Sequence, residues 1–525
     1  MSSPITSQPF ANSGIPDWLT QAQLAGMQRG IEKEGLRMSP EGYIASTPHP
    51  VKLGSKLTHP LITTDYAESL LELITEPKDT PKQALAMLRE LHVVVQQALA
   101  NDELFWPLSM PCMLSTDDKD IVLADYGTSN IGQLKTLYRN GLGIRYGRRM
   151  QTIAGLHYNL SFGDDLFAKW QQQTGDTRHL SEFKNEKYLG LIRNFKRLNS
   201  LVLYLFGASP CVCACFLKDR EHHLKPLNNT TYYLPKATSL RMGKLGYQNN
   251  VQDDLDIRYN TLPEYTQGLQ AAIHTAHATF TALGVDDSEG NPIQINDHVL
   301  QIENEYYSPI RPKQITQSGE APSTALAKRG IAYVEFRAID LDPYSDIGIR
   351  LSTACFMETL ALYCLVSDSP DLMPNEETVL ARNQENVVNQ GREPNLNIEI
   401  FGSGERPLKD WMQEHLHKMQ PFAALLDSFH GGNDYRTAIT LMSGKTLHPD
   451  FTLSAQVLAD TERLGSAWKL GKSLAEQHAK QLRQITLSPN RQAFYEILAE
   501  KSVMQQTDIE NQDTQAFYDF IQQYR

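Results

Sequence analysis

The sequence predicts an α+β fold in which helices surround a mostly antiparallel sheet. Five short segments alternate apolar and polar residues with period two, which is typical of strands that bury one face. These segments are scattered through the chain with helical stretches between them, and from about residue 405 onward the pattern is helical. The predicted strands cover residues 30–37, 69–75, 156–162, 299–306 and 332–339.

Helix signals place the surrounding elements. Thr80 and Pro81 are a good N-cap and first helical residue for a helix that runs to about residue 100. A second helix is expected over residues 261–283, where Gly284 would end it. Three more are expected near the C-terminus, over residues 408–429, 454–485 and 490–504.

The 525 residues, 41% of them hydrophobic, are enough to bury a large core. We expect a main domain over residues 15–400 and a helical C-terminal part over 401–525 that packs on it without folding independently. The longest uncharged stretch, residues 201–217, is short for a membrane span and is broken at Gly207 and Pro210, which favours a buried helix ending in a turn.

The charge balance limits the partners. A formal net charge of −12 makes the chain a poor binder of nucleic acid, and a nucleotide would need Mg²⁺ and arginines between its phosphates and the acidic groups. The polar start has no secretion signal, so we expect a cytoplasmic protein without membrane attachment. Six cysteines are too few for a disulfide scaffold, and Cys211, Cys213 and Cys215 are interpreted as small core residues.

Glu32 and Glu34 carry the first chemical signal, because they fall on one face of a predicted strand. One such pair is more often solvent-exposed, but two carboxylates held close together repel each other unless a cation lies between them. The pattern recurs: His157 alternates with Asn159, and Glu335 with Arg337. The segment 299–306 adds Glu303 and Glu305, and Glu72 lies inside an apolar run after Asp65. Together these strands predict a sheet with one polar, functional face.

Oxygen ligands with a single imidazole favour Mg²⁺, or Mn²⁺, over zinc. Arg337 would point into the same cavity, where it either holds a transferring phosphoryl group or forms a salt bridge. There is no P-loop, because Ile439 stands where the motif before Gly444, Lys445 and Thr446 needs glycine. From the residues alone, a metal-dependent phosphohydrolase and a non-catalytic protein with a structural cation both stay open.

Long blocks of the chain resemble a known family, the bacterial glutamate–cysteine ligases (γ-glutamylcysteine synthetases) of the proteobacterial type. The resemblance runs from about residue 26 to the C-terminus and weakens beyond about residue 370. The blocks are GMQRGIEKEGLR from Gly26, LTHPLITTDYAESLLELIT from Leu57, WPLSMPC from Trp106, YGTSNIGQLKTLYRNGL from Tyr126, YLFGASP from Tyr204, YYLPKATSLRMGKLGY from Tyr232 and LQIENEYYSPIRPK from Leu300.

The resemblance implies a fold related to glutamine synthetase, with a curved antiparallel sheet that forms an active-site funnel. It implies that Arg337 is catalytic and contacts the phosphoryl group and the glutamate. The metal positions that it implies are Glu32, Glu34, Asp65, Glu72, His157 and Glu335. The implied substrate-binding positions, mostly in the cysteine pocket, are Tyr66, Tyr138, Leu142, Gln151, Ile153, Arg241, Tyr247, Tyr307 and Arg337. Gln317 stands where the family has arginine, so its loop is assigned no role.

The activity implied by the resemblance is ligation of L-glutamate to L-cysteine with ATP as co-substrate, the first step of glutathione biosynthesis. Mg²⁺ would be the metal, with Mn²⁺ as the alternative. A monomer and feedback inhibition by glutathione are further expectations. A related ligase that uses a different amine stays open as an alternative.

Overall fold

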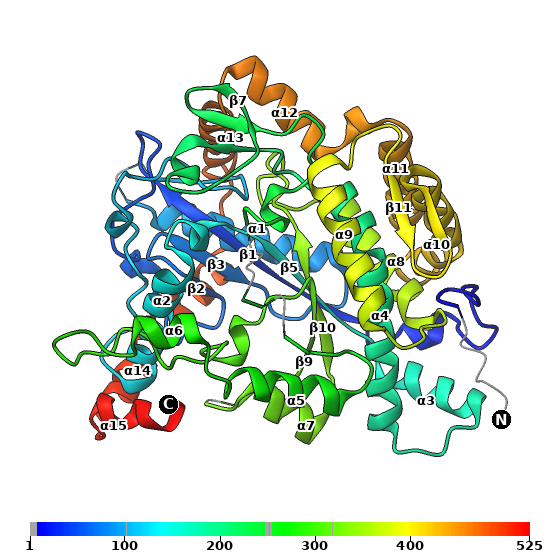
Figure 1. Ribbon diagram of the computed structural model, residues 1–525, viewed down its shortest axis with the longest axis horizontal. Coiled ribbons are helices and arrows are strands. Elements are labelled where there is room, and N and C mark those ends of the chain that lie inside the picture. Colours follow the sequence, from blue (N-terminus) through cyan, green and yellow to red (C-terminus); the bar gives the residue numbers. More distant parts are fainter. Residues whose placement is uncertain (1–7, 101, 247–250, 253–254, 318) are drawn as a thin grey trace.

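A seven-stranded antiparallel sheet lies at the centre of the protein. The computed structural model describes residues 8–525 except 101, 247–250, 253–254 and 318. The strand order is β2-β3-β1-β5-β10-β9, with β4 paired to β1, and every strand pair of this sheet is antiparallel. Figure 1 shows these strands side by side with helices around them. The predicted α+β class with an antiparallel sheet is confirmed.

The strands of the central sheet are β1 (Gln28–Met38), β2 (Ile62–Thr64), β3 (Leu70–Ile74), β4 (Leu104–Phe105), β5 (Leu156–Ser161), β9 (Ile310–Lys313) and β10 (Tyr333–Ile339). Two smaller antiparallel sheets contain β6 (Cys211–Cys213), β7 (Lys225–Asn228) and β8 (Thr231–Tyr233), and β11 (Asn397–Ile400) and β12 (Gly404–Pro407).

The helices in the first two thirds of the chain are α1 (Pro81–Ala98), α2 (Asn130–Tyr146), α3 (Asp164–Thr174), α4 (Leu180–Phe206), α5 (Leu262–Ala272), α6 (Ala278–Leu283) and α7 (Pro322–Arg329). Those that follow are α8 (Leu351–Val366), α9 (Pro374–Gln390), α10 (Leu408–His430), α11 (Asp434–Leu447), α12 (Leu453–Leu464), α13 (Ala467–Leu482), α14 (Pro489–Gln512) and α15 (Phe517–Ile521).

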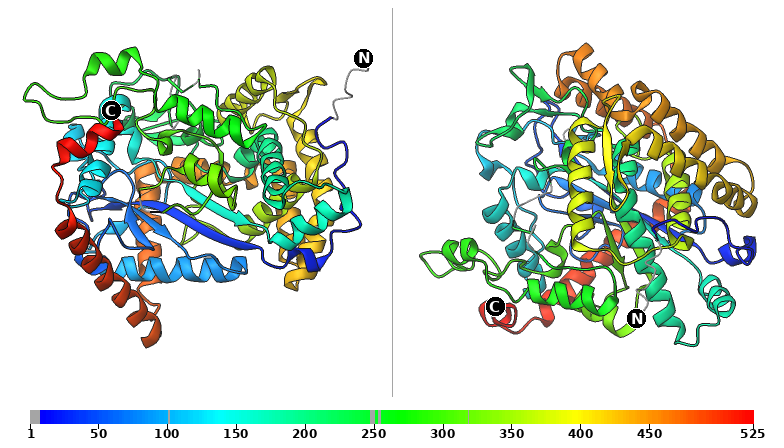
Figure 2. Two further views of the ribbon diagram at one scale, coloured as in Figure 1. Left: turned by 90° about the horizontal axis from the view of Figure 1, so that it is seen from below. Right: turned by 45° about the vertical axis from the view of Figure 1, so that its right-hand side comes forward.

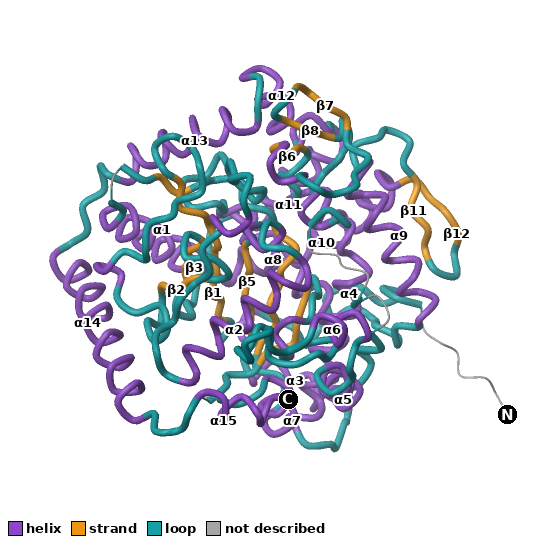
Figure 3. Tube along the Cα trace, turned by 60° about the vertical axis from the view of Figure 1, so that its left-hand side comes forward, coloured by secondary structure: helices purple, strands orange, loops and turns teal. Residues whose placement is uncertain are grey.

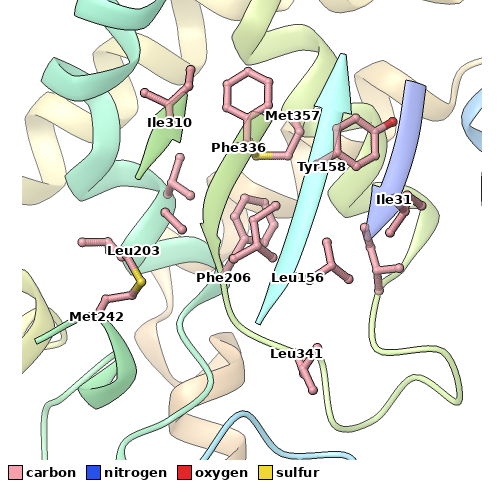
Figure 4. Packing of buried hydrophobic residues seen from close by; sticks show 14 of the residues in the cluster. Ile31, Leu156, Tyr158, Leu203, Phe206, Met242, Ile310, Phe336, Leu341 and Met357 are labelled. Atoms are coloured by element: carbon pink, nitrogen blue, oxygen red, sulfur yellow. The ribbon is translucent and has the colours of Figure 1, made fainter. Parts of the chain in front are cut away.

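The core lies on the face of the sheet that Ile31, Tyr158 and Phe336 share. Figure 4 shows these side chains and those of Leu203 and Met357, which belong to α4 and α8. Because strand side chains alternate, the residues between them, such as Glu32, His157 and Glu335, point to the other face. Burying the apolar face against α4, α8 and α1 therefore fixes which side chains line the functional face.

Two of the predicted helices are interrupted. Helix α1 begins as predicted, with Thr80 accepting a hydrogen bond from the Gln83 backbone N–H. Residues 261–283 instead form α5 and α6, because backbone groups of residues 272–277 pair with residues 297–300. Residues 454–485 are split into α12 and α13 at Gly465, which has φ +88°, and Ser466 caps α13.

The predicted strand over 299–306 is wrong. Its first residues pair with the break between α5 and α6, and Glu303–Glu305 is a 3-10 helix. Glu303 accepts hydrogen bonds from the backbone N–H and hydroxyl of Ser323 at the start of α7. Glu305 accepts from the Tyr146 hydroxyl (2.6 Å) and the Gln301 backbone N–H (2.7 Å). Both carboxylates are occupied by donors from other segments of the chain, so neither belongs to the functional face.

The C-terminal helices reach back to the first half of the chain. Figure 3 shows α14 along the outside of the molecule with α15 beyond it, and α15 contacts α2. One hydrophobic cluster contains residues on both sides of residue 400, from Phe10 to Tyr495. The division at residue 400 stays a prediction. In the part of the chain that the structure describes, no helix combines the length and apolar character needed to span a membrane.

Candidate active site

The strand register brings most of the predicted acidic residues onto one face of the sheet. Glu32 of β1 lies opposite His157 of β5, and Glu34 lies opposite Glu72 of β3. Glu335 of β10 lies opposite Asn159 of β5. Segments that are separated by up to 303 positions in the sequence, from Glu32 to Glu335, therefore contribute neighbouring side chains to a single polar row.

Three residues form the tightest group. Nδ1 of His157 lies 3.2 Å from Oε2 of Glu32 and 3.6 Å from Oε1 of Glu335. One ligand atom from each of these residues falls within 4.8 Å of the other two. Asn159 donates through Nδ2 to Oε1 of Glu32 (2.8 Å), which orients that carboxylate. Two carboxylates and an imidazole at this separation can hold one divalent cation.

A second group of acids continues the row from the other side of His157. Oε1 of Glu34 lies 3.8 Å from Nε2 of His157, and Oε2 accepts a hydrogen bond from the Gly155 backbone N–H (2.6 Å). Glu72 lies opposite Glu34 in the sheet, and Asp65 follows β2, the neighbouring strand. Burial and the charge of Glu34 raise the pKa of Asp65 to about 6. Burial, Glu32, Asp65 and Glu34 together hold the pKa of Glu72 well above its ordinary value.

The pKa values of Glu32 and Glu335 shift in the opposite direction, below their ordinary values. Burial opposes ionisation of Glu32, but its hydrogen bond with His157 holds its pKa below the ordinary value. Burial likewise opposes ionisation of Glu335, while Lys313 and Arg337 hold its pKa well below the ordinary value. The site thus holds two readily ionised carboxylates and two whose ionisation is disfavoured until a cation is added.

The chemistry of these residues fits Mg²⁺ or Mn²⁺. The donor set is five carboxylates, four from glutamates and one from an aspartate, together with a single imidazole, and it contains no thiolate. Oε2 of Glu335 is buried without a hydrogen bond, although Nζ of Lys313 lies 3.3 Å away. Oδ1 of Asn159 is also buried without a partner. Such acceptors are what a hard cation and its water ligands require.

Cationic side chains face the acids from β9 and β10. Nη1 of Arg337 lies 3.1 Å from Oε1 of Glu335 and 3.5 Å from Nδ1 of His157. Lys313 contacts the same carboxylate, and Arg311 lies opposite Glu335 in the sheet. Sequence reasoning missed Lys313 and Arg311, although their period-two spacing in Ile310–Lys313 was a usable signal.

A cluster around Asp340 supports Arg241 beside Arg337. Arg241 donates through Nη2 to the backbone carbonyl of Arg337 (3.0 Å), and its Nη1 lies 3.4 Å from Oδ1 of Asp340. The hydroxyls of Ser209 and Ser239 donate to Asp340 at 2.6 and 2.9 Å. Asp340 was missed because it follows β10 with no pattern of its own.

The remaining predicted pocket residues come from four segments. Tyr307 donates through its hydroxyl to Sδ of Met242, the residue after Arg241 (3.0 Å). Burial raises the pKa of Tyr307, and the nearby Arg241 and Arg337 oppose that shift. The other described positions are Tyr66 after β2, Tyr138 and Leu142 on α2, and Gln151 and Ile153 in and after a 3-10 helix before β5.

Contacts bring part of this set near the acids. Tyr66 is 1% exposed, and its hydroxyl lies against Gly143 of α2. Any side chain larger than that of glycine at position 143 would collide with this hydroxyl. Arg139 of α2 donates to the backbone carbonyl of Asp65. Helix α2 is thereby held over the acidic row at the Asp65 end. Tyr247 lies outside the described residues.

Comparison with known proteins agrees with this arrangement. The family model described as glutamate-cysteine ligase matches residues 16–387. Glutamate–cysteine ligases of Azotobacter vinelandii and Alcanivorax borkumensis are 43% and 44% identical to the chain, covering 100% and 96% of it and 98% and 96% of their own lengths. The crystal structure of a glutamate–cysteine ligase from Francisella tularensis in complex with AMP has a TM-score of 0.89 and 35% identity, covering 95% of this chain and 97% of that one.

A bifunctional glutathione synthetase from Pasteurella multocida shares the fold at a TM-score of 0.72 and 23% identity, covering 91% of this chain and 57% of that one. The family match covers most of the chain, and the relatives align over nearly their full lengths. This chain belongs to the glutamate–cysteine ligase family.

Proposed function

We propose that this protein joins the γ-carboxylate of L-glutamate to the amine of L-cysteine, using ATP and releasing ADP and phosphate. This is the first step of glutathione biosynthesis. The observation that carries the proposal is the row of acids on one face of the sheet, with Arg337 beside it, in a chain of this family. Such a row suits a cation-bound nucleotide and offers no thiol or hydroxyl nucleophile of its own.

The first step activates the carboxylate, which is a poor electrophile at neutral pH. An oxygen of the glutamate γ-carboxylate attacks the γ-phosphorus of ATP, ADP leaves, and an acyl phosphate results. Mg²⁺ held by Glu32, His157 and Glu335, and by Glu34, Asp65 and Glu72, would supply charge neutralisation for the phosphates. Arg337 adds a fixed positive charge where the phosphoryl group moves, because its guanidinium is already held by Glu335.

The second step makes the amide. The neutral cysteine amine attacks the acyl carbon, the tetrahedral intermediate collapses, and phosphate leaves with the acyl–oxygen bond electrons. The proton that the amine must lose goes to a base that no residue pattern identifies. Arg241 and Tyr307 are the proposed partners of the cysteine carboxylate, since a guanidinium and a phenol hydroxyl both donate to carboxylates. Tyr138, Leu142, Gln151, Ile153, Tyr66 and Tyr247 complete the proposed pocket.

The deciding experiment measures ADP release with Mg²⁺ and ATP while glutamate and cysteine are added singly and together. The proposal expects fast release only with glutamate and an amine acceptor, and 2-aminobutyrate should replace cysteine with a higher KM. Fast release without amino acids would instead identify a phosphohydrolase. Release at background rate under every condition would indicate a non-catalytic binding protein.

The pocket assignment needs its own test. Tyr138→Ala should raise the KM for cysteine more than it changes glutamate-dependent ATP cleavage, because Tyr138 is assigned to the amine pocket. Leu283→Ala, which changes an exposed residue outside the site, is the matched control. Equal effects on both amino acids would contradict the assignment.

A further inference from the structure

Two cysteines on neighbouring elements lie in direct contact away from the acidic row. Cys213 ends β6, and Cys215 lies in the 3-10 helix Ala214–Leu217 that follows. Their Sγ atoms are 2.8 Å apart, against about 2.05 Å in a disulfide. The chain turns from strand to 3-10 helix between them, and this turn brings the two side chains together.

Exposure separates this pair from the other thiols. Cys213 and Cys215 are half-buried, whereas Cys112, Cys211, Cys355 and Cys364 are buried. A small reagent can therefore reach the pair in the folded protein but not the remaining four thiols. Packing alone does not require two sulfur atoms to touch at a partly exposed position.

We propose that Cys213 and Cys215 form a dithiol site that low-molecular-weight disulfides oxidise to an intramolecular disulfide. The class of reagent is a small organic disulfide, of which glutathione disulfide is the probe. The site responds to the thiol–disulfide ratio around the protein.

The surroundings make Cys215 the attacking thiol. The backbone N–H of Leu114 donates to its Sγ at 3.3 Å. Arg149, which donates to the backbone carbonyl of Cys215 at 2.7 Å, adds positive charge. The hydrogen bond with Cys213 is the largest effect, and with these others it lowers the pKa of Cys215 to about 7. A thiolate stabilised in this way is the nucleophilic form of cysteine.

A hollow lies beside the segment that follows the pair, although neither cysteine lines it. It has a volume of about 580 Å³, and Arg149, Lys218 and Arg220 contribute its cationic lining. Lys218 and Arg220 directly follow the 3-10 helix that carries Cys215. Asp117, Asp118 and Asp219 line it too and balance these charges, and Arg149 pairs with Asp118 at 2.6 Å.

The proposed oxidation takes place in two thiol–disulfide exchange steps. The Cys215 thiolate attacks one sulfur of the reagent, a protein–reagent disulfide forms, and one reagent thiolate leaves. The Cys213 thiol loses its proton to water and attacks Sγ of Cys215, so the mixed disulfide breaks and the second reagent thiolate leaves. The two protein thiols lose two electrons, the reagent disulfide gains them, and both released thiolates take up protons as their pKa dictates.

The test treats the native full-length protein with glutathione disulfide near pH 8, blocks the remaining thiols and maps the peptide around residues 211–217 by mass spectrometry. The proposal expects the count of free thiols to fall from six to four, with a Cys213–Cys215 link that a reducing agent reverses. Cys213→Ser should stop at a mixed disulfide on Cys215. Cys215→Ser should lose the fast reaction, and Cys112→Ser should behave as the wild type does.

Three outcomes would overturn the proposal. They are six free thiols in the treated native protein, a stable mixed disulfide in the wild type, and a link that joins Cys112 or Cys211 instead. Treatment of the urea-unfolded protein shows that the reagent is active. Circular dichroism of each variant shows that it is folded, and the mapping of the wild type stands even if a variant does not fold.

Discussion

Carboxylates lie on both sides of the same sheet, and their surroundings differ. On the core side, Glu358 of α8 is fully buried and accepts hydrogen bonds from Arg29 (2.7 and 3.1 Å) and from the hydroxyls of Tyr158 and Tyr435 (2.7 Å each). On the other side, Glu34, Asp65 and Glu72 face one another more than they face donors.

The contrast separates a structural acid from a functional one. A buried carboxylate surrounded by donors keeps its charge and holds elements together, here β1, β5, α8 and α11. Carboxylates grouped without enough donors raise one another's pKa and cost stability unless a cation joins them. Glu358 and Glu34 are both buried, so the difference between them lies in what each oxygen contacts.

The largest expected effect concerns activity. Glu34→Gln should abolish ligation and glutamate-dependent ADP release, since the variant loses a charge that the cation needs while its amide oxygen can still accept from Gly155. The free energy of unfolding should stay the same or rise, because repulsion with Asp65 and Glu72 falls. ADP release and urea unfolding are the measurements. Near-normal turnover would remove Glu34 from the metal site.

The matching change on the core side should lower stability and leave the active site intact. Glu358→Gln should lower the free energy of unfolding by about 3–5 kcal/mol, because Arg29 is left buried without a counter-charge. The fraction that remains folded should keep a normal KM for ATP. Urea unfolding monitored by circular dichroism measures the loss. A cost below about 1 kcal/mol would mean that Glu358 is not the partner that holds Arg29.

Adding the cation should stabilise the folded protein, and this effect should depend on the acidic face alone. Mg²⁺ at 100 times its Kd should stabilise the protein by about 2.7 kcal/mol, and a chelator should reverse the effect. The readout is the midpoint of thermal unfolding at constant ionic strength. The double variant Glu34→Gln/Glu335→Gln should show no such rise, and an equal rise in both proteins would place the binding elsewhere.

The core side of β1 carries one unusual charge, Lys33, which is 2% exposed and lies over the Phe105 ring. Burial lowers the pKa of Lys33 to about 7. Between that value and the ordinary value near 10.5, the unfolded chain binds the extra proton. The free energy of unfolding should therefore rise with pH across this window, by at most about 1.4 kcal/mol per pH unit.

Urea unfolding at pH 7.5 and 8.5 tests this against Lys33→Met, in which the rise should be absent. The neighbouring His92 and His478 do not interfere, because burial lowers the pKa of both, to about 4 for His478. Parallel pH profiles for the two proteins would show that Lys33 titrates normally.

The smallest expected effect lies at the start of α1, which covers the core side of β1. Thr80→Ala should cost about 1 kcal/mol of stability through loss of the hydrogen bond from Gln83, with unchanged kinetics. Thr80→Ser, which keeps the hydroxyl, should be close to wild type in urea unfolding. A loss of activity in the alanine variant would couple this helix to the acidic face.

Patterns confined to a few residues were enough to predict part of the fold and part of the candidate site. Period two in β1, β5 and β10 predicted both the strands and which residues share a face, because side-chain direction in a strand depends only on alternation. Thr80 and Pro81 predicted the start of α1 for an equally local reason. The family blocks added the expected roles.

Only the tertiary structure could decide which acids lie together. Glu303 and Glu305 alternate as Glu32 and Glu34 do, yet Ser323 and Tyr146 occupy their oxygens. The pairing of residues 272–277 with 297–300 that replaced a predicted helix and strand is also a long-range event. A carboxylate becomes structural or functional through the donors that distant segments bring to it, and no local pattern records those distances.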